Sequence, residues 1–304
     1  MQQPSFDPGL TQQFTAPLRR AINKDGTFNV HRRGTTWRDF HPYMHLINMG
    51  WSAFFATVFA AYCLVNLIFA GIYFQLGPNQ LEGAAAATEL GRFWNDFFFS
   101  THTLSTVGYG NISPHGTAAN VVAAVEALVG VLGLAVATGL LFGRVSRPSA
   151  RIGFSQNLLV APYQDITSLQ FRVVNRRQND LVDIEARVML MTVEAAAGGL
   201  PRRKYTLLRL ERQQVMFLPL TWTVVHPIDS ESPLWGKSAD ELSKVQAEVM
   251  ILLKAYDDTF SQTVLARYSY RFDEFVWDRR FAPAFTVDSQ GDLVLELKKV
   301  GEIA

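Results

Sequence analysis

The stretch Thr106-Val107-Gly108-Tyr109-Gly110 lies between two long apolar segments of the 304-residue chain. Its two glycines accept backbone conformations that other residues resist, which lets successive carbonyl oxygens point to one side. A ring of such oxygens replaces the hydration shell of a bare cation. One chain supplies one copy of the loop, so a four-loop ring requires four chains around a symmetry axis. The stretch therefore predicts a cation-selective filter at residues 106–110.

Two nearly charge-free runs flank this stretch. Residues 46–76 hold no charged side chain, and residues 118–143 hold a single one, Glu126. Each run exceeds the roughly 20 apolar residues that a helix needs to cross a bilayer. We therefore predict membrane-spanning helices over residues 49–76 and 117–143, within a pore domain that ends at residue 147.

The segment between the two predicted spans is aromatic and too short to cross a bilayer. Residues 93–105 include Phe93, Trp94 and three consecutive phenylalanines. Non-helical backbone at membrane depth is tolerated where it lines water or is buried in protein. We therefore predict a re-entrant pore helix over 93–105 that leads into the filter. In the first span, we expect the polar Asn66 to form a helix–helix hydrogen bond.

Composition argues against several classes of function. The net charge is +1 at pH 7, so no bulk charge indicates a nucleic-acid partner. The one cysteine, Cys63, offers neither a disulfide framework nor a metal-ligand cluster. The sequence shows no nucleophile paired with a general base and no G-x-G-x-x-G motif after a predicted strand. We therefore predict that the chain is not an enzyme and uses no organic cofactor.

The residues before the first span divide into two parts. Residues 1–32 are rich in Gln, Pro, Thr and Asn without an apolar period, which predicts a mobile cytoplasmic tail. Within residues 33–48, apolar side chains from Trp37 to Ile47 recur at three- and four-residue spacing. This pattern predicts a short amphipathic helix in the headgroup plane. The alternative is that these residues are the entry turn of the first span.

Basic residues flank both spans on one side, whereas the loop at residues 77–92 holds a single arginine. By the positive-inside rule, both termini are expected in the cytoplasm. The same side chains are candidates to bind anionic lipid headgroups, or they serve as topology signals alone. These candidates are Arg32, Arg33, Arg38, Arg144, Arg147 and Arg151.

A row of residues spaced by four marks one stripe of the second span. The row consists of Glu126, Gly130, Leu134, Thr138 and Phe142. The row drifts around an ideal helix, so a tilted helix is required for all five residues to face one axis. We predict that Glu126, Leu134 and Thr138 line a pore. For Glu126, a polar contact behind the filter and a cation site in the pore cavity remain alternatives.

Residues 148–304 read as a second domain of short strands. Apolar and alternating runs recur and are separated by turns such as 197–199 and 288–291, which predicts an antiparallel β-sandwich. Residues 238–244 are expected to form one short helix. Asp183, Glu185 and Arg187 alternate, so they share one face of a strand. That face is either solvated or lines a water-filled vestibule that concentrates cations.

The chain resembles the inward-rectifier potassium channel family, specifically its bacterial branch, from about residue 33 to the C-terminus. The resemblance rests on the filter and on short motifs throughout the chain. These motifs are Phe97-Phe98-Phe99-Ser100, Gly139-Leu140-Leu141-Phe142 leading to Arg147-Pro148, Phe154-Ser155-Gln156-Asn157, Trp222-Thr223-Val224-Val225-His226-Pro227-Ile228-Asp229, Ser232-Pro233-Leu234 and Ala266-Arg267-Tyr268-Ser269-Tyr270.

The resemblance implies a homotetramer with a membrane pore and an immunoglobulin-like cytoplasmic β-sandwich. It places potassium at Thr106, Val107, Gly108 and Tyr109, and a bundle-crossing constriction at Phe142.

The resemblance also has implications for block of the pore by cations and for the residues that support the filter. Leu134 stands where strongly rectifying members carry an acid that binds Mg²⁺ or polyamines, so the resemblance implies weak rectification. Asp183 or Glu185 matches an acidic vestibule position that leaves weaker block available. His102 and Ile112 stand where many members have a glutamate–arginine pair behind the filter. That salt bridge is absent here, and His102 is expected either to hydrogen-bond behind the filter or to pack as a neutral side chain.

The function that we predict is passive, potassium-selective conduction in a bacterial inner membrane. Movement of the second domain and of the interfacial helix is expected to widen the pore at Phe142, with modulation by anionic phospholipids. Two alternatives remain at this point. One is a non-selective cation channel, and the other is a membrane-anchored β-sandwich that senses or binds a partner and conducts nothing.

Overall fold

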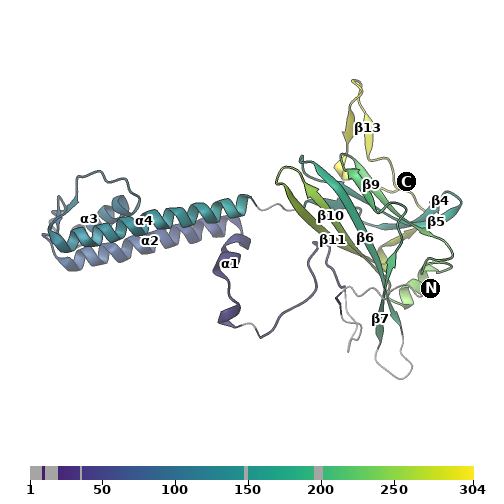
Figure 1. Ribbon diagram of the computed structural model, residues 1–304, viewed down its shortest axis with the longest axis horizontal. Coiled ribbons are helices and arrows are strands. Elements are labelled where there is room, and N and C mark those ends of the chain that lie inside the picture. The colour runs from purple at the N-terminus through teal and green to yellow at the C-terminus, as the bar shows by residue number, and fades with distance from the viewer. Residues whose placement is uncertain (1–8, 11–19, 35, 147–149, 195–200) are drawn as a thin grey trace. The chain divides into compact units, whose positions relative to one another are not determined.

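The computed structural model describes residues 9–10, 20–34, 36–146, 150–194 and 201–304 (Figure 1). The chain forms two compact units. One unit comprises Arg33–Arg147, and the other combines Met1–Arg32 with Pro148–Ala304.

The first unit is built on two long apolar helices that lie side by side (Figure 1). These are α2 (Trp51–Leu76) and α4 (Gly116–Val145), with mean hydropathies of 2.1 and 2.3. Only 22% and 11% of their most apolar windows are buried within the chain. A core helix of a soluble protein would be mostly buried, so these exposed apolar surfaces suit a bilayer.

A shorter helix, α3 (Glu89–Leu104), packs against both α2 and α4. It begins four residues earlier than the predicted pore helix, because the Thr88 side chain accepts a hydrogen bond from the Gly91 amide at 3.1 Å. A two-stranded sheet joins the segment before α3 to the segment that follows the filter stretch. In it, β1 (Leu81–Glu82) pairs antiparallel with β2 (Ser113–Pro114).

The interfacial segment is shorter and more broken than the helix that its sequence predicts over residues 33–48. It consists of a 3₁₀ turn, η1 (Trp37–Asp39), and the seven-residue helix α1 (Pro42–Asn48). The interruption has a local cause: Pro42 disfavours helical backbone at His41, which is extended with φ −107° and ψ 100°.

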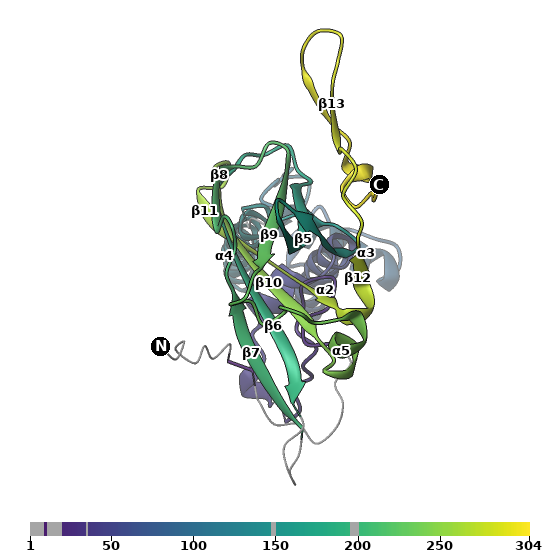
Figure 2. The same cartoon turned by 90° about the vertical axis from the view of Figure 1, so that its right-hand side faces the viewer.

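The second unit is a sandwich of two five-stranded sheets (Figure 2). The first sheet has the order β11-β10-β6-β7 with β8 also paired to β6, and the second has the order β12-β4-β5-β3 with β9 also paired to β5. Their bounds are β3 (Ile152–Phe154), β4 (Leu158–Tyr163), β5 (Ile166–Asn175), β6 (Leu181–Glu194), β7 (Arg202–Leu208), β8 (Gln214–Phe217), β9 (Thr221–Ile228), β10 (Glu248–Asp257), β11 (Gln262–Arg271) and β12 (Phe275–Trp277).

One apolar core fills the space between the two sheets. Its fully buried members include Phe171 and Val173 from one sheet and Ile184, Val188 and Ile251 from the other. The predicted fold class, two membrane helices followed by a β-sandwich, is confirmed. The prediction of purely antiparallel pairing is wrong at one edge, where β12 pairs parallel with β4.

Several smaller elements also belong to the second unit. Helix α5 (Ala239–Lys244) begins where expected, because Ser238 and Glu241 form a capping box. A hairpin of β13 (Phe285–Val287) and β14 (Leu293–Leu295) projects from the sandwich (Figures 1 and 2). The last 3₁₀ turn, η3 (Leu297–Lys299), follows it.

The N-terminal segment around Ile22 is attached to the sandwich, in contrast to this part of the mobile tail predicted over residues 1–32. Residues 1–8 and 11–19 of the predicted tail lie outside the described residues. Ile22 is buried, and its carbonyl oxygen accepts a hydrogen bond from Ser269 Oγ at 2.7 Å. The Ala21 amide donates to both carboxylate oxygens of the buried Glu248, each at 3.1 Å. Composition missed this attachment because one inserted apolar side chain and a few backbone hydrogen bonds leave no periodic pattern.

A charged cluster reinforces this attachment, and its pH dependence is testable. Arg20 and Lys24 both form ion pairs with Glu274. Burial alone would raise the pKa of Glu274, but hydrogen bonds from Lys24 and the Arg271 amide, with the charge of Arg20, hold it below its ordinary value of 4.5. A lowered folded-state pKa stabilises the attachment above about pH 4.5, and this stabilisation is lost as the pH falls through the folded-state pKa.

We therefore expect amide hydrogen exchange at residues 21–24 to accelerate below pH 4.5 after correction for intrinsic rates. The variant E274Q should exchange quickly at neutral pH as well. E296Q, which removes a similar ion pair to Lys299 elsewhere in the unit, is the matched control. Unchanged protection in E274Q at pH 7 would show that the cluster does not hold the segment.

Candidate functional site

The filter stretch has an alternating backbone. Thr106, Gly108 and Gly110 have positive φ values of 64°, 55° and 79°, whereas the residues between them do not. Alternating handedness turns successive peptide groups so that their carbonyl oxygens face the same side. The Thr106 amide donates to Thr103 O at 3.0 Å, and the Gly108 amide donates to His102 O at 3.2 Å. The end of α3 therefore fixes the start of the filter through its own carbonyls.

His102, for which the family resemblance implies a place behind the filter, contacts a residue of this stretch. Its ring meets the Tyr109 ring edge to face, with centroids 4.8 Å apart. Ile112 packs against the apolar cluster that contains Phe69, Tyr73 and Phe99. His102 therefore makes an aromatic contact, and Ile112 makes apolar contacts. These are the two positions at which many family members have an ion pair.

Glu126 does not line a pore, which corrects the prediction from the residue spacing. Its side chain is fully buried within the single chain. Its Oε2 accepts a hydrogen bond from Tyr73 OH at 2.7 Å, and its Oε1 lies 2.5 Å from Ser100 Oγ. Ser100 Oγ also lies 3.1 Å from Asn66 Oδ1, so the hydrogen bond expected of Asn66 is confirmed. Of the two alternatives for Glu126, these hydrogen bonds favour a polar contact over a cation site in the pore cavity.

These four residues, Asn66, Tyr73, Ser100 and Glu126, form a buried network that joins α2, α3 and α4. Sequence reasoning identified Asn66 and Glu126 as polar residues within apolar spans. It missed Ser100 and Tyr73, which are unremarkable in sequence: a serine after three phenylalanines and a tyrosine near a helix end.

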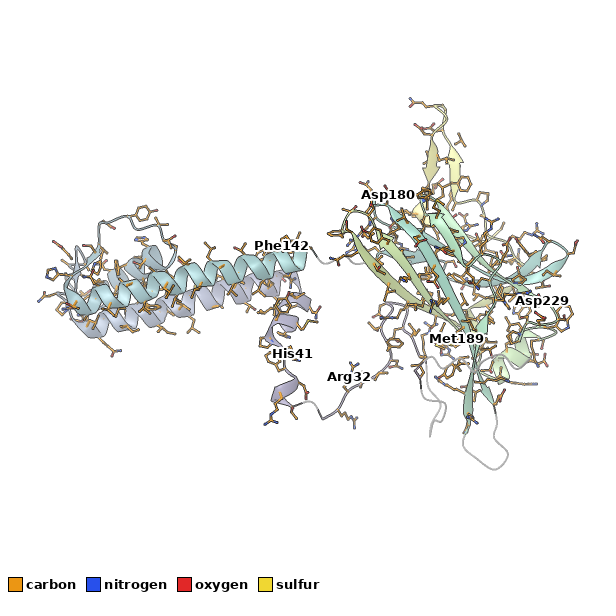
Figure 3. The ribbon with its side chains drawn as sticks, viewed as in Figure 1. Arg32, His41, Phe142, Asp180, Met189 and Asp229 are labelled. Carbon is orange, nitrogen blue, oxygen red and sulfur yellow. The ribbon has the colours of Figure 1, made fainter. Side chains whose placement is uncertain are left out.

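The row of residues on α4 turns away from α3 after Gly130. A Cβ atom at Gly130 would lie 2.1 Å from the Leu104 carbonyl oxygen, so this part of α4 is in tight contact with the end of α3. Further along, the side chains of Leu134 and Phe142 are 67% and 72% exposed within the chain, and Thr138 is exposed too. Figure 3 shows Phe142 near the end of α4. These three residues are free to face neighbouring chains or a pore.

The candidate vestibule acids sit at an irregularity of β6. Asp183 has a positive φ of 55°, and the pairing of β6 with β10 shifts between Lys254 and Tyr256. Asp183 accepts a hydrogen bond from Gln214, and Glu185 forms an ion pair with Arg187 at 2.8 Å. Arg187 offsets the charge of Glu185, whereas the neutral Gln214 leaves the negative charge of Asp183 in place.

The candidate lipid-binding arginines differ in their availability. Arg32, Arg33, Arg38 and Arg151 are exposed, and Arg147 lies outside the described residues. Arg144 is engaged elsewhere: it donates to the carbonyl oxygens of Ile47 at 2.9 Å and Met49 at 2.8 Å, and to Leu46 O as well. Its guanidinium also lies 4.6 Å from the ring centroids of Trp51 and Phe54.

Arg144 therefore serves the last turn of α1, whose carbonyl oxygens lack partners within the helix. This arrangement argues against Arg144 as a headgroup ligand, because three of its five N–H donors already bind carbonyl oxygens of the chain and its Nε is buried.

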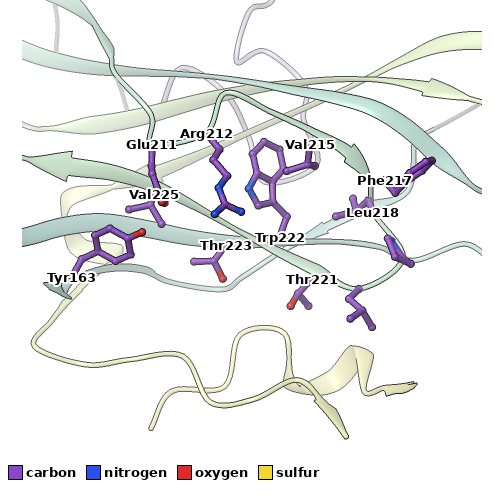
Figure 4. A pocket seen from close by; sticks show the side chains of 12 residues that line it. Tyr163, Glu211, Arg212, Val215, Phe217, Leu218, Thr221, Trp222, Thr223 and Val225 are labelled. Atoms are coloured by element: carbon purple, nitrogen blue, oxygen red, sulfur yellow. The ribbon is translucent and has the colours of Figure 1, made fainter. Parts of the chain in front are cut away.

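The sandwich contains a cavity of about 460 Å³ beside β8 and β9 (Figure 4). Arg212 and Trp222 lie in its wall, and Tyr163 hydrogen-bonds Glu211 there, which raises the pKa of Tyr163. Across the described residues, no group of three His, Cys, Asp or Glu side chains is placed to hold a metal ion.

Comparison with known proteins decides the family. The description "Inward rectifier potassium channel C-terminal domain" matches residues 152–304, and the description "Ion channel" matches residues 57–147. The chain is 34% identical to "Inward rectifier potassium channel Kirbac3.1" from Paramagnetospirillum magnetotacticum, over 97% of this chain and 100% of that protein. The chain belongs to the inward rectifier potassium channel family.

More distant members of the family are also similar. The human G protein-activated inward rectifier potassium channel 3 is 26% identical over 93% of this chain and 78% of its own length. The human G protein-activated inward rectifier potassium channel 2 is 25% identical over 89% and 69%. A member of this family is a membrane protein and an ion channel, and not an enzyme.

Proposed function

We propose that four copies of this chain form a pore that conducts potassium passively, with a filter built from residues 106–110. Family membership supplies the permeant ion and the expectation of a tetramer. The alternating backbone of the filter stretch supports the assignment most directly, because it aligns the carbonyls of Thr106, Val107, Gly108 and Tyr109. Four such sets replace the hydration shell of potassium without a charged side chain.

The number of chains separates this proposal from a membrane-anchored sensor. Mass measurement of the purified protein in mild detergent should give four chains in each particle. A monomer that persists in lipid nanodiscs would exclude the pore, because one chain holds one filter loop.

We propose Phe142 as the main constriction on the conduction path. It lies near the end of α4, its side chain is exposed within the chain, and it stands twelve residues after Gly130, which anchors the helix to α3. A ring of four phenylalanines at this level closes a pore by excluding water. Widening of this ring would follow movement of α4 together with α1, since Arg144 joins the two helices.

The variant F142A should raise resting potassium flux into liposomes by about tenfold, because a ring of methyl groups no longer dewets the constriction. L141A, the neighbouring substitution on the same turn, is the control. Equal flux in F142A and the unmodified protein would remove Phe142 as the main constriction.

The proposal also covers block of the pore by cations, binding of anionic phospholipids and the membrane that holds the protein. We expect weak block by Mg²⁺ or polyamines, because Leu134 offers no charge and Glu185 is paired with Arg187, which leaves Asp183 as the one candidate acid without a cationic partner. Anionic phospholipids would be bound through the exposed arginines Arg32, Arg33, Arg38 and Arg151, with Arg147 a further candidate. The distribution of basic residues supports an orientation with both termini in the cytoplasm. The similarity to the Paramagnetospirillum magnetotacticum channel supports a bacterial inner-membrane location.

A further inference from the structure

The protonation state of Glu126 decides how many hydrogens are available for hydrogen bonds within the buried network. Ser100 Oγ carries one hydrogen, yet it faces three acceptor oxygens. These are Glu126 Oε1 at 2.5 Å, Asn66 Oδ1 at 3.1 Å and Asn66 O at 3.3 Å. The orientation of the Asn66 amide is fixed, because Asn66 Nδ2 donates to Tyr62 O at 2.8 Å. A reversed amide would place an oxygen against that carbonyl.

An ionised Glu126 leaves this network incomplete. The Ser100 hydroxyl would donate to the carboxylate, and Asn66 Oδ1 would then face the oxygen of Ser100 with no hydrogen between them. A protonated Glu126 completes the network, because it donates from Oε1 to Ser100, and Ser100 donates to Asn66 Oδ1. Tyr73 OH donates to Glu126 Oε2 in either case. Buried polar atoms are satisfied in native proteins, which favours the protonated acid.

The charges around Glu126 favour the same state. Helix α2 carries no basic side chain, α4 carries none before Arg144, and α3 carries a single arginine, Arg92. Arg92 lies eight residues before Ser100 and pairs with Glu89 at 2.8 Å. The other titratable residues of α3 beside the network are the buried acid Asp96 and His102, whose ring contacts Tyr109. A buried carboxylate without a cation is costly.

We propose that Glu126 is a neutral carboxylic acid whose hydrogen bond to Ser100 positions α3, and through it the filter, against α4. This inference rests on the filter assignment proposed above. The carbonyls of His102 and Thr103, which bind the Gly108 and Thr106 amides, follow Ser100 by less than one turn. A shift of α3 at Ser100 therefore moves the start of the filter directly. Glu126 is a positioning residue and touches no ion.

The protonation is tested by infrared difference spectroscopy of the full-length protein in lipid vesicles at pH 7. The unmodified protein minus E126Q should show the carbonyl band of a protonated carboxylic acid, and that band should shift in heavy water. A difference spectrum that contains carboxylate bands instead would overturn the proposal. This readout does not depend on conduction, so it stands even if the filter assignment fails.

The positioning role is tested by potassium and sodium flux into the same vesicles. E126Q keeps a donor and an acceptor in place, so it should retain potassium selectivity. E126L leaves Tyr73 OH without its partner and removes the hydrogen bond that joins Ser100 to α4, so it should lower the potassium-to-sodium flux ratio by about tenfold, which corresponds to about 1.4 kcal/mol. S100A should lower the ratio in the same direction, and it decides the question if E126L does not assemble.

Thr57→Val is the matched control, because the Thr57 hydroxyl bonds back to Ala53 O on α2 and lies outside the network. Wild-type selectivity in an assembled E126L, or in S100A if E126L does not assemble, would overturn the positioning role. Poor selectivity in the unmodified protein would instead count against the filter assignment.

Discussion

Replacing Gly108 by alanine should abolish most of the potassium selectivity of this channel. Gly108 has a φ of 55°, in the left-handed region that residues with a Cβ atom resist. The cost is about 1–2 kcal/mol in each chain, and four chains contribute to one filter. The carbonyl of residue 108 should therefore leave the alignment, and the potassium-to-sodium flux ratio should fall by roughly tenfold or more.

The space around Gly108 makes this prediction specific to backbone conformation. A Cβ atom there would meet no other atom within 4 Å in the chain, so a clash within the chain is not the cause. Gly71→Ala is the control, since Gly71 lies inside α2 with equally open surroundings and no positive φ. Unchanged selectivity in G108A would mean that residues 106–110 do not use this backbone to bind the ion.

Replacing Gly130 by alanine should destabilise the assembled channel. The new Cβ atom would lie 2.1 Å from the Leu104 carbonyl oxygen and 2.9 Å from the carbonyl carbon. Both are backbone atoms at the end of α3, so neither yields by a side-chain rotation. We expect a loss of about 1–3 kcal/mol in each chain, the usual cost of overpacking, and a lower melting temperature of the purified protein in detergent.

The matched control for this substitution is three residues further along the same helix. A Cβ atom at Gly133 would meet nothing within 4 Å, so G133A should leave the melting temperature unchanged or raise it slightly. If G130A and G133A melt alike, α4 does not approach α3 as closely as the structure shows. Because Leu104 immediately precedes the filter region, G130A should also reduce potassium selectivity.

The parts of the fold that the sequence predicts well are those with a local signal. The two nearly charge-free runs correspond to α2 and α4, and the alternation of Asp183, Glu185 and Arg187 corresponds to β6. A filter at residues 106–110 could be proposed because five consecutive residues carry the chemistry that it needs. The short strands β3 and β12, of three residues each, were missed because so few residues show no alternation.

The assignment of Glu126 to the pore failed for a geometric reason. Each four-residue step on an α-helix turns by about 40° beyond a full circle, so four steps from Glu126 to Phe142 turn by about 160°. The beginning of the row therefore faces α3, and its end faces away. The end of the row that faces the pore depends on how α3 packs against α4. That packing involves Ser100, Leu104 and Gly130, and no periodic pattern in the sequence links these residues.

Arg144 shows a second limit of sequence reasoning. A basic residue after an apolar helix is typical of a headgroup ligand, yet its donors go to Leu46, Ile47 and Met49. Those carbonyls are available because α1 ends at Asn48. The end of a short helix is among the least certain features of a sequence, so the partner of Arg144 could not be predicted.

The central claim, a potassium-selective filter at residues 106–110, is tested most directly by cation uptake into liposomes that contain the purified protein. Uptake of potassium, rubidium and sodium should be compared, with barium as the blocker and F142A included to hold the constriction open. The proposal predicts barium-sensitive uptake of potassium and rubidium that exceeds sodium uptake by at least about tenfold. Equal uptake of sodium and potassium through F142A would contradict it.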